Sequence, residues 1–189
     1  MSEGGAGQGW PLALHAVARR AGAARWLDAR LFETLGGWVS SVPEPEIKIA
    51  LAVQASHHGW HATLWAERLP TLHDVEPSSW VGPASAGVES AVDLLASATL
   101  SVERLVGVHR VLLPRLVAAH TEQLEAACPV TDAPTIRTLG LVRRDEIADQ
   151  LVGERLLQGL LLTKANVQRA AAQQAAVESL LAEAGPLLG

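Results

Sequence analysis

The sequence predicts an all-α fold, an antiparallel bundle of helices around one hydrophobic core. Alanine, leucine, glutamate, glutamine and arginine, which all favour helices, dominate its 189 residues. Alternating runs of β-branched residues, which would predict strands, are absent. Apolar residues instead recur at steps of three and four, as on the buried face of a helix. The length is sufficient for four or five helices in one domain.

Glycine and proline divide the chain into a lead and five predicted helices. Residues 1–10 are small and polar and are expected to form a flexible lead, followed by a single helical domain over 11–189. The helices are expected at about 11–35, 46–68, 88–127, 132–162 and 164–185.

The boundaries of these helices follow from local chemistry. Gly36 and Gly37 are typical of a helix C-terminus, so the first helix is expected to end before them. Pro45 suits the first turn of the second helix, and Pro114 predicts a kink within the third. Asp132 is a plausible N-cap for the fourth helix, which is followed by a fifth segment rich in alanine and glutamine.

The segment 71–87 is long for a loop in a helical domain and contains two prolines. Loops of this length in four-helix bundles cross from one end of the bundle to the other. We therefore expect a crossover between the second and third helices.

Composition excludes several classes of function. The net charge of -5 gives no basic surface for nucleic acid. No apolar stretch approaches the length of a membrane span, and no signal peptide is evident, so a cytoplasmic protein without membrane contacts is expected. Cys128 is the only cysteine, which excludes a disulfide framework and a thiolate zinc cluster.

Ionisable residues occupy positions that ought to be buried on three of the predicted helices. Walking each helix in steps of three and four places His58 and His61 on the core face of the second, and His109 on that of the third. The fourth places Glu146 and Asp149 there.

The heights of these residues can be estimated from the short turn near residue 129. If the chain reverses there, His109 lies opposite Asp149 and Glu146 lies opposite Leu113. His120 would lie opposite Leu139 as an ordinary core histidine. On the first helix, either Asp28 or Glu33 could face the same layer, and the sequence does not decide between them.

Buried carboxylates are costly unless they are paired or bind a cation. Histidines and carboxylates that converge in a bundle core can meet this requirement by coordinating a divalent metal, and these donors together suit iron, manganese or zinc. The candidate ligands are His58, His61, His109, Glu146 and Asp149, completed by Asp28 or Glu33.

The segment Glu146-Ile147-Ala148-Asp149, together with His58 and His61, resembles the motifs of the ferritin-like superfamily. In that family Glu-x-x-His motifs occur on two helices and single glutamates on the other two. Here Asp149 stands where the family has histidine, and His58 stands where it has glutamate. The resemblance implies a four-helix bundle with a long crossover, an iron or di-iron centre, Glu33 as the first-helix ligand, and oxidase or hydroxylase activity on a small molecule.

A second hypothesis needs no metal. The same groups would then form a buried salt-bridge network in a ferritin-like bundle that acts as a binding or scaffold module. The predicted helix at 164–185 could in that case mediate association into a homo-oligomer.

Overall fold

The computed structural model of the chain describes residues 14–189, which are all-helical and contain no β-strand. The predicted lead, 1–10, and the start of the first predicted helix lie outside these residues. The α-helices are α1 (Leu14–Val39), α2 (Pro45–Ala66), α3 (Ala86–Ala96), α4 (Ser101–Val106), α5 (Leu113–Ala126), α6 (Ala133–Leu160) and α7 (Lys164–Ala184). They are accompanied by a 3-10 turn, η1 (Pro77–Trp80), and a π-helical segment, η2 (Gly107–Leu112).

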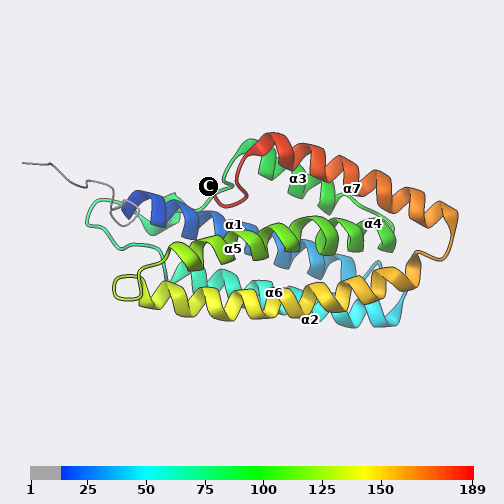
Figure 1. The fold of residues 1–189 in the computed structure, drawn as a ribbon, viewed down its shortest axis with the longest axis horizontal. Helices are drawn as coiled ribbons and strands as arrows, with labels where there is room; N and C mark the ends of the chain where they lie inside the picture. Colours follow the sequence, from blue (N-terminus) through cyan, green and yellow to red (C-terminus); the bar gives the residue numbers. More distant parts are fainter. Residues whose placement is uncertain (1–13) are drawn as a thin grey trace, which may run out of the picture.

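Within the described part of the chain, four long rods lie side by side: α1, α2, the continuous α4–η2–α5, and α6 (Figure 1). Helices α1 and α2 are antiparallel, since Asp28 contacts His58 and Gly36 lies against Ala55. Helices α5 and α6 are also antiparallel, and α2 packs on α6. The core between the rods is rich in leucine, including Leu27, Leu31, Leu35, Leu51, Leu105, Leu112, Leu116, Leu139 and Leu157.

The first helix continues past the predicted stop at Gly36 and Gly37 and ends at Val39. The reason is tertiary packing. Trp38 is buried, its indole N–H donates to the carbonyl of Ala96, and the Arg104 guanidinium lies 5.2 Å from its ring centroid. These contacts outweigh the weak helix propensity of two glycines.

The third predicted helix is not continuous. It is broken at residues 97–100, which separate α3 from α4. Arg104 stabilises the break by donating hydrogen bonds to the carbonyl of Ala98 and to the Ser41 hydroxyl, both at 2.9 Å. Immediately before Pro114, the position of the predicted kink, the structure has a π-helical segment, and the Leu113 N–H at its end reaches the Val108 carbonyl five residues back.

The connection from α2 to α4 therefore includes a helix of its own. It passes through η1, which packs on α1, and then through α3, which packs against α7 above the four rods (Figure 1). Ser85 caps α3 by accepting from the Val88 N–H, and its hydroxyl donates to the carbonyl of Ala184 at the end of α7. The last predicted helix, 164–185, is confirmed as α7. No described helix combines the length and apolarity needed to cross a membrane.

Candidate metal centre

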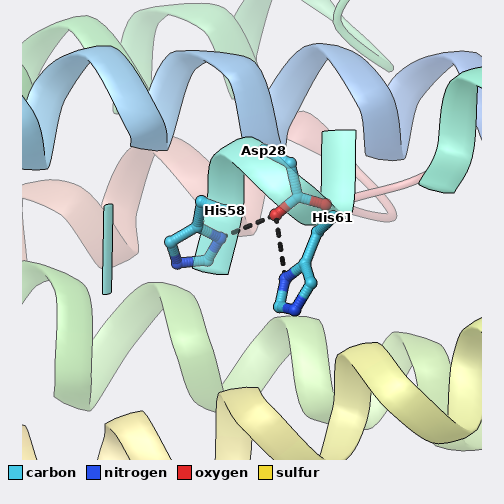
Figure 2. A group of neighbouring side chains, drawn as sticks. All are labelled: Asp28, His58 and His61. Atoms are coloured by element: carbon cyan, nitrogen blue, oxygen red, sulfur yellow. Dashed lines mark hydrogen bonds and ion pairs between the residues drawn. The ribbon is translucent and has the colours of Figure 1, made fainter. Parts of the chain in front are cut away.

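Three buried side chains from α1 and α2 converge at one point between the rods. Asp28 comes from α1, and His58 and His61 stand one turn apart on the buried face of α2. The Nδ1 atom of His58 lies 2.6 Å from Oδ1 of Asp28, and Nδ1 of His61 lies 3.8 Å from the same oxygen. Figure 2 shows both rings directed at this one carboxylate oxygen. One ligand atom from each residue lies within 4.8 Å of those of the other two.

The histidines determine the charge of this group. Burial alone would raise the pKa of Asp28, but the hydrogen bond with His58 and the proximity of both histidines outweigh it and lower that pKa to about 2. Burial likewise opposes the charged form of His61, but the nearby carboxylates of Asp28 and Asp145 outweigh it and raise the pKa of His61. Asp28 is therefore an ionised carboxylate at neutral pH.

Each member of the group also keeps one buried polar atom without a hydrogen-bond partner among the described residues. These atoms are Oδ2 of Asp28, Nε2 of His58 and Nδ1 of His61. Buried polar atoms are nearly always satisfied, so three exceptions in one place need an explanation. The other nitrogen of His61, Nε2, lies 3.4 Å from Oδ2 of Asp145 on α6.

A second buried pair joins α5 to α6. His120 Nδ1 lies 3.0 Å from Oε2 of Glu146, and both side chains are completely buried. The ring of Trp65 stacks on His120 with a centroid separation of 5.4 Å. The prediction that His120 faces Leu139 and Glu146 faces Leu113 is therefore wrong, because α6 begins beyond the end of α5 at the turn (Figure 1) and its residues are displaced in height.

Asp149 is buried on α6, but it lies outside the group of three. Its carboxylate contacts Nδ1 of His57 at 2.8 Å, and its backbone carbonyl accepts from the Gln54 amide. Burial raises the pKa of Asp149, although the hydrogen bond and charge of His57, with smaller effects of His58 and His61, lower it. Asp149 is thus close enough to the group for the histidines to affect its pKa, but it adds no fourth ligand atom to the group.

His109 is buried as predicted, but it does not lie opposite Asp149. Its ring packs against Gly153, one turn further along α6. Its Nδ1 donates to the carbonyl of Leu105 and its Nε2 contacts the Gln54 amide, both at 3.0 Å. Burial lowers the pKa of His109 to about 4, although the bond to Leu105 favours the charged form. Both ring nitrogens thus face oxygen atoms of other residues, and the ring takes no part in the group of three.

Replacing Gly153 with alanine should destabilise the protein by about 2 to 3 kcal/mol, because the new methyl group would overlap the buried His109 ring. Gly140→Ala on the same helix is the matched control. A Cβ at Gly140 meets open space, so this variant should be stabilised by up to about 1 kcal/mol. Guanidinium unfolding followed by circular dichroism measures both, and equal effects would contradict the packing of His109 on Gly153.

The structure also decides between the two carboxylates of the first helix. Asp28 is buried in the group, whereas Glu33 is exposed and forms a surface ion pair with Arg30 at 3.2 Å. Glu33 lies on the side of α1 away from the core. It takes no part in the site.

Four residues at or beside this region were not among the predicted ligands: Gln54, His57, His120 and Asp145. Gln54 and His120 lie on the predicted core faces, so periodicity alone marks them as buried. Asp145 lies one position off the α6 core face and His57 one position off that of α2. Only the packing of α2 on α6 brings these two to the site.

No protein-family model, no curated protein and no solved structure matches this chain, so its function must be inferred from its own residues.

Proposed function

We propose that this chain is a ferritin-like helical protein that binds a divalent metal ion between Asp28, His58 and His61. We further propose that the metal, iron first, would serve one of two reactions of a small molecule: its oxidation, in which two of its electrons pass to dioxygen, or its hydroxylation by dioxygen, in which a separate electron donor supplies the two electrons that reduce the second oxygen atom to water. One observation carries the proposal: two histidines and a carboxylate meet in the core with their ligand atoms within 4.8 Å of one another.

The spacing of these atoms suits a common ion. Zinc or iron holds nitrogen and oxygen ligands at about 2.0 to 2.2 Å, so ligand atoms on one ion stand about 3 Å apart. The separations of 2.6 and 3.8 Å between Asp28 Oδ1 and the two Nδ1 atoms lie on either side of that value. A cation here would also engage unpartnered polar atoms of the group, whose burial is otherwise unfavourable.

The ligand set indicates which metal is preferred. Two histidines and one carboxylate with further positions open are typical of iron(II) that activates oxygen, although zinc and manganese accept the same donors. An iron(II) ion held here would supply oxygen activation. Asp145 would orient His61 by accepting a hydrogen bond from its Nε2, as carboxylates behind metal-binding histidines do. The leucine-rich core around the group would exclude bulk water.

The arrangement of the helices supports the ferritin-like part of the proposal. Four long rods pack together, and the connection between the second and third rods is long and runs along the outside (Figure 1). The metal-ligand candidates come from α1 and α2. A second histidine–carboxylate pair, His120 and Glu146, joins the other two rods.

Metal titration tests the proposal directly. Chelator-stripped protein is titrated anaerobically with Fe²⁺, and separately with Zn²⁺ and Mn²⁺, by isothermal titration calorimetry. We expect one ion per chain, and a loss of affinity of at least about 100-fold in His58→Asn and in His61→Asn. Oxygen consumption by the iron-loaded protein, absent from the zinc-loaded protein, would support the redox role.

His57→Asn is the matched control, because His57 is adjacent in sequence but faces Asp149 instead of the group. It should bind metal as the wild type does. Circular dichroism checks that each variant is folded. Equal binding by the wild type and both ligand variants, or no binding at all, would contradict the metal centre.

The second candidate function is a metal-free binding module. It is favoured by the fact that three buried carboxylates, Asp28, Glu146 and Asp149, each have a histidine partner already. Under this hypothesis the titration shows no ion, and the ligand variants lose only stability.

A further inference from the structure

A pocket of about 540 Å³ opens between α2 and α6 on the surface next to the proposed metal centre. Its volume lies in the range of small-molecule sites. A second pocket, of about 570 Å³, lies between α1, η1 and the C-terminus and includes no residue of the centre. Of these two pockets, the α2–α6 pocket is the one whose occupant would be close to the buried group.

The floor of the pocket is connected to the buried histidines. It contains Gln54 and Asp149, both buried, and Gln54 contacts His109 while donating to the backbone of Asp149. The Asp149 carboxylate in turn contacts Nδ1 of His57, which is next to His58 on α2. The polar floor of the pocket thus lies beside the segment of α2 that carries the proposed metal ligands.

The walls of the pocket are apolar although they face solvent. Ile49 and Val53 form one wall on α2, and Val152 and Leu156 form the other on α6. Ile49 is 68 % exposed and Val53 is 49 % exposed, which is unfavourable unless an apolar group covers them.

The rim carries one positive and one negative charge. Arg155 on α6 and Glu46 in the first turn of α2 both line the pocket, and neither has an ion-pair partner among residues 14–189. The Glu46 carboxylate is stabilised by the positive, N-terminal end of the α2 helix dipole. The guanidinium of Arg155 has five donors and suits a carboxylate.

We infer that the α2–α6 pocket binds a small amphiphilic carboxylate, with its apolar chain on Ile49, Val53 and Val152 and its carboxylate on Arg155. The inference rests on the proposed function only in naming this molecule as the substrate class. Binding itself requires no metal.

Octanoate is the probe, and octylammonium, with the same chain and the opposite charge, is its control. Binding to the full chain, with and without Zn²⁺, is followed by calorimetry and by NMR shifts of residues lining the pocket. We expect octanoate to bind at least about tenfold more tightly than octylammonium. Arg155→Gln should weaken octanoate about five- to tenfold, and Glu46→Gln should tighten it by removing repulsion.

Val53→Trp fills the pocket from an exposed position, so it should fold normally and abolish octanoate binding. All three variants should retain the zinc affinity of the wild type, which separates this test from that of the metal centre. Tighter binding of octylammonium, or octanoate binding that survives Val53→Trp, would overturn the inference. A wild-type dimer that Val53→Trp makes monomeric, with no octanoate bound, would also overturn it, since a second copy would then cover the face.

Discussion

Glu146→Leu is expected to lower the free energy of unfolding of the metal-free protein by about 3 kcal/mol or more. The substitution removes the only hydrogen-bond partner that His120 has among the described residues, and both side chains are completely buried. Removing one member of a buried pair leaves the other without compensation, which costs more than the pair itself contributes. Chemical denaturation in the presence of a chelator measures the loss without interference from bound metal.

The double variant Glu146→Leu, His120→Leu should recover most of that stability. Both polar groups are then gone, and the space between α5 and α6 is filled by side chains that suit the surrounding leucine core. Replacing a whole buried pair by apolar residues is often neutral or stabilising. The double variant is therefore expected within about 1 kcal/mol of the wild type. Its loss should thus be far smaller than the summed losses of the two single variants, Glu146→Leu and His120→Leu.

Glu33→Leu is the matched surface control. Glu33 is an exposed carboxylate on α1 whose ion pair with Arg30 lies at the surface, so its removal should change stability by less than about 1 kcal/mol. If the two single losses at Glu146 and His120 simply added in the double variant, the two residues would not act as a coupled pair, and the packing of α5 on α6 described above would be incorrect.

The fold could be predicted from the sequence wherever local chemistry and tertiary packing agree. Pro45 at the start of α2 and Asp132 at the N-cap position of α6 both stand at boundaries that the structure contains. The break between α3 and α4 could not be predicted, because residues 97–100 include neither glycine nor proline. It depends on Arg104, which donates to the carbonyl of Ala98 within the break and to the hydroxyl of Ser41, 63 positions away in the sequence.

Burial of the candidate site residues could be predicted, but their partners could not. Periodicity correctly placed His58, His61, His109, Glu146 and Asp149 in the core. To predict which of these residues contact one another, the position of each along its helix axis must be known. Two features of the structure shift those positions. Helix α6 starts beyond the end of α5 (Figure 1). The π-helical segment before Leu113 takes up more residues per turn than an α-helix, so positions beyond it are displaced relative to α6.

The choice between Asp28 and Glu33 illustrates the same limit. Both lie on α1 and both are carboxylates, and the ferritin-like resemblance favoured glutamate. What selects Asp28 is the antiparallel packing of α1 on α2, which brings it to His58 and leaves Glu33 beside Arg30 on the surface. That packing is a property of the folded chain, and no local pattern around either residue records it.

A saturating divalent metal is expected to stabilise the wild type by about 4 kcal/mol when its free concentration is 1,000 times its dissociation constant. For a chain of this length, the melting temperature should then rise by about 10 °C. The physical reason lies in Oδ2 of Asp28 and Nδ1 of His61, which are buried without hydrogen-bond partners in the described structure and which a cation can engage only in the folded state. Zn²⁺ is the probe, because it accepts the same donors without redox chemistry.

The decisive comparison is between two buried aspartates. Asp28→Asn should abolish the zinc-dependent rise in melting temperature. The amide that replaces the carboxylate carries no negative charge with which to bind the dication. Asp149→Asn should retain it, since Asp149 is buried to a similar degree but contacts His57 and lies outside the group. Both variants alter a buried aspartate that contacts a histidine, so general destabilisation affects both, and only a true ligand changes the response to metal. If Asp149→Asn lost the response to zinc and Asp28→Asn kept it, the metal centre would have to lie nearer α6. If the wild type showed no response, the buried histidines would have a structural role alone.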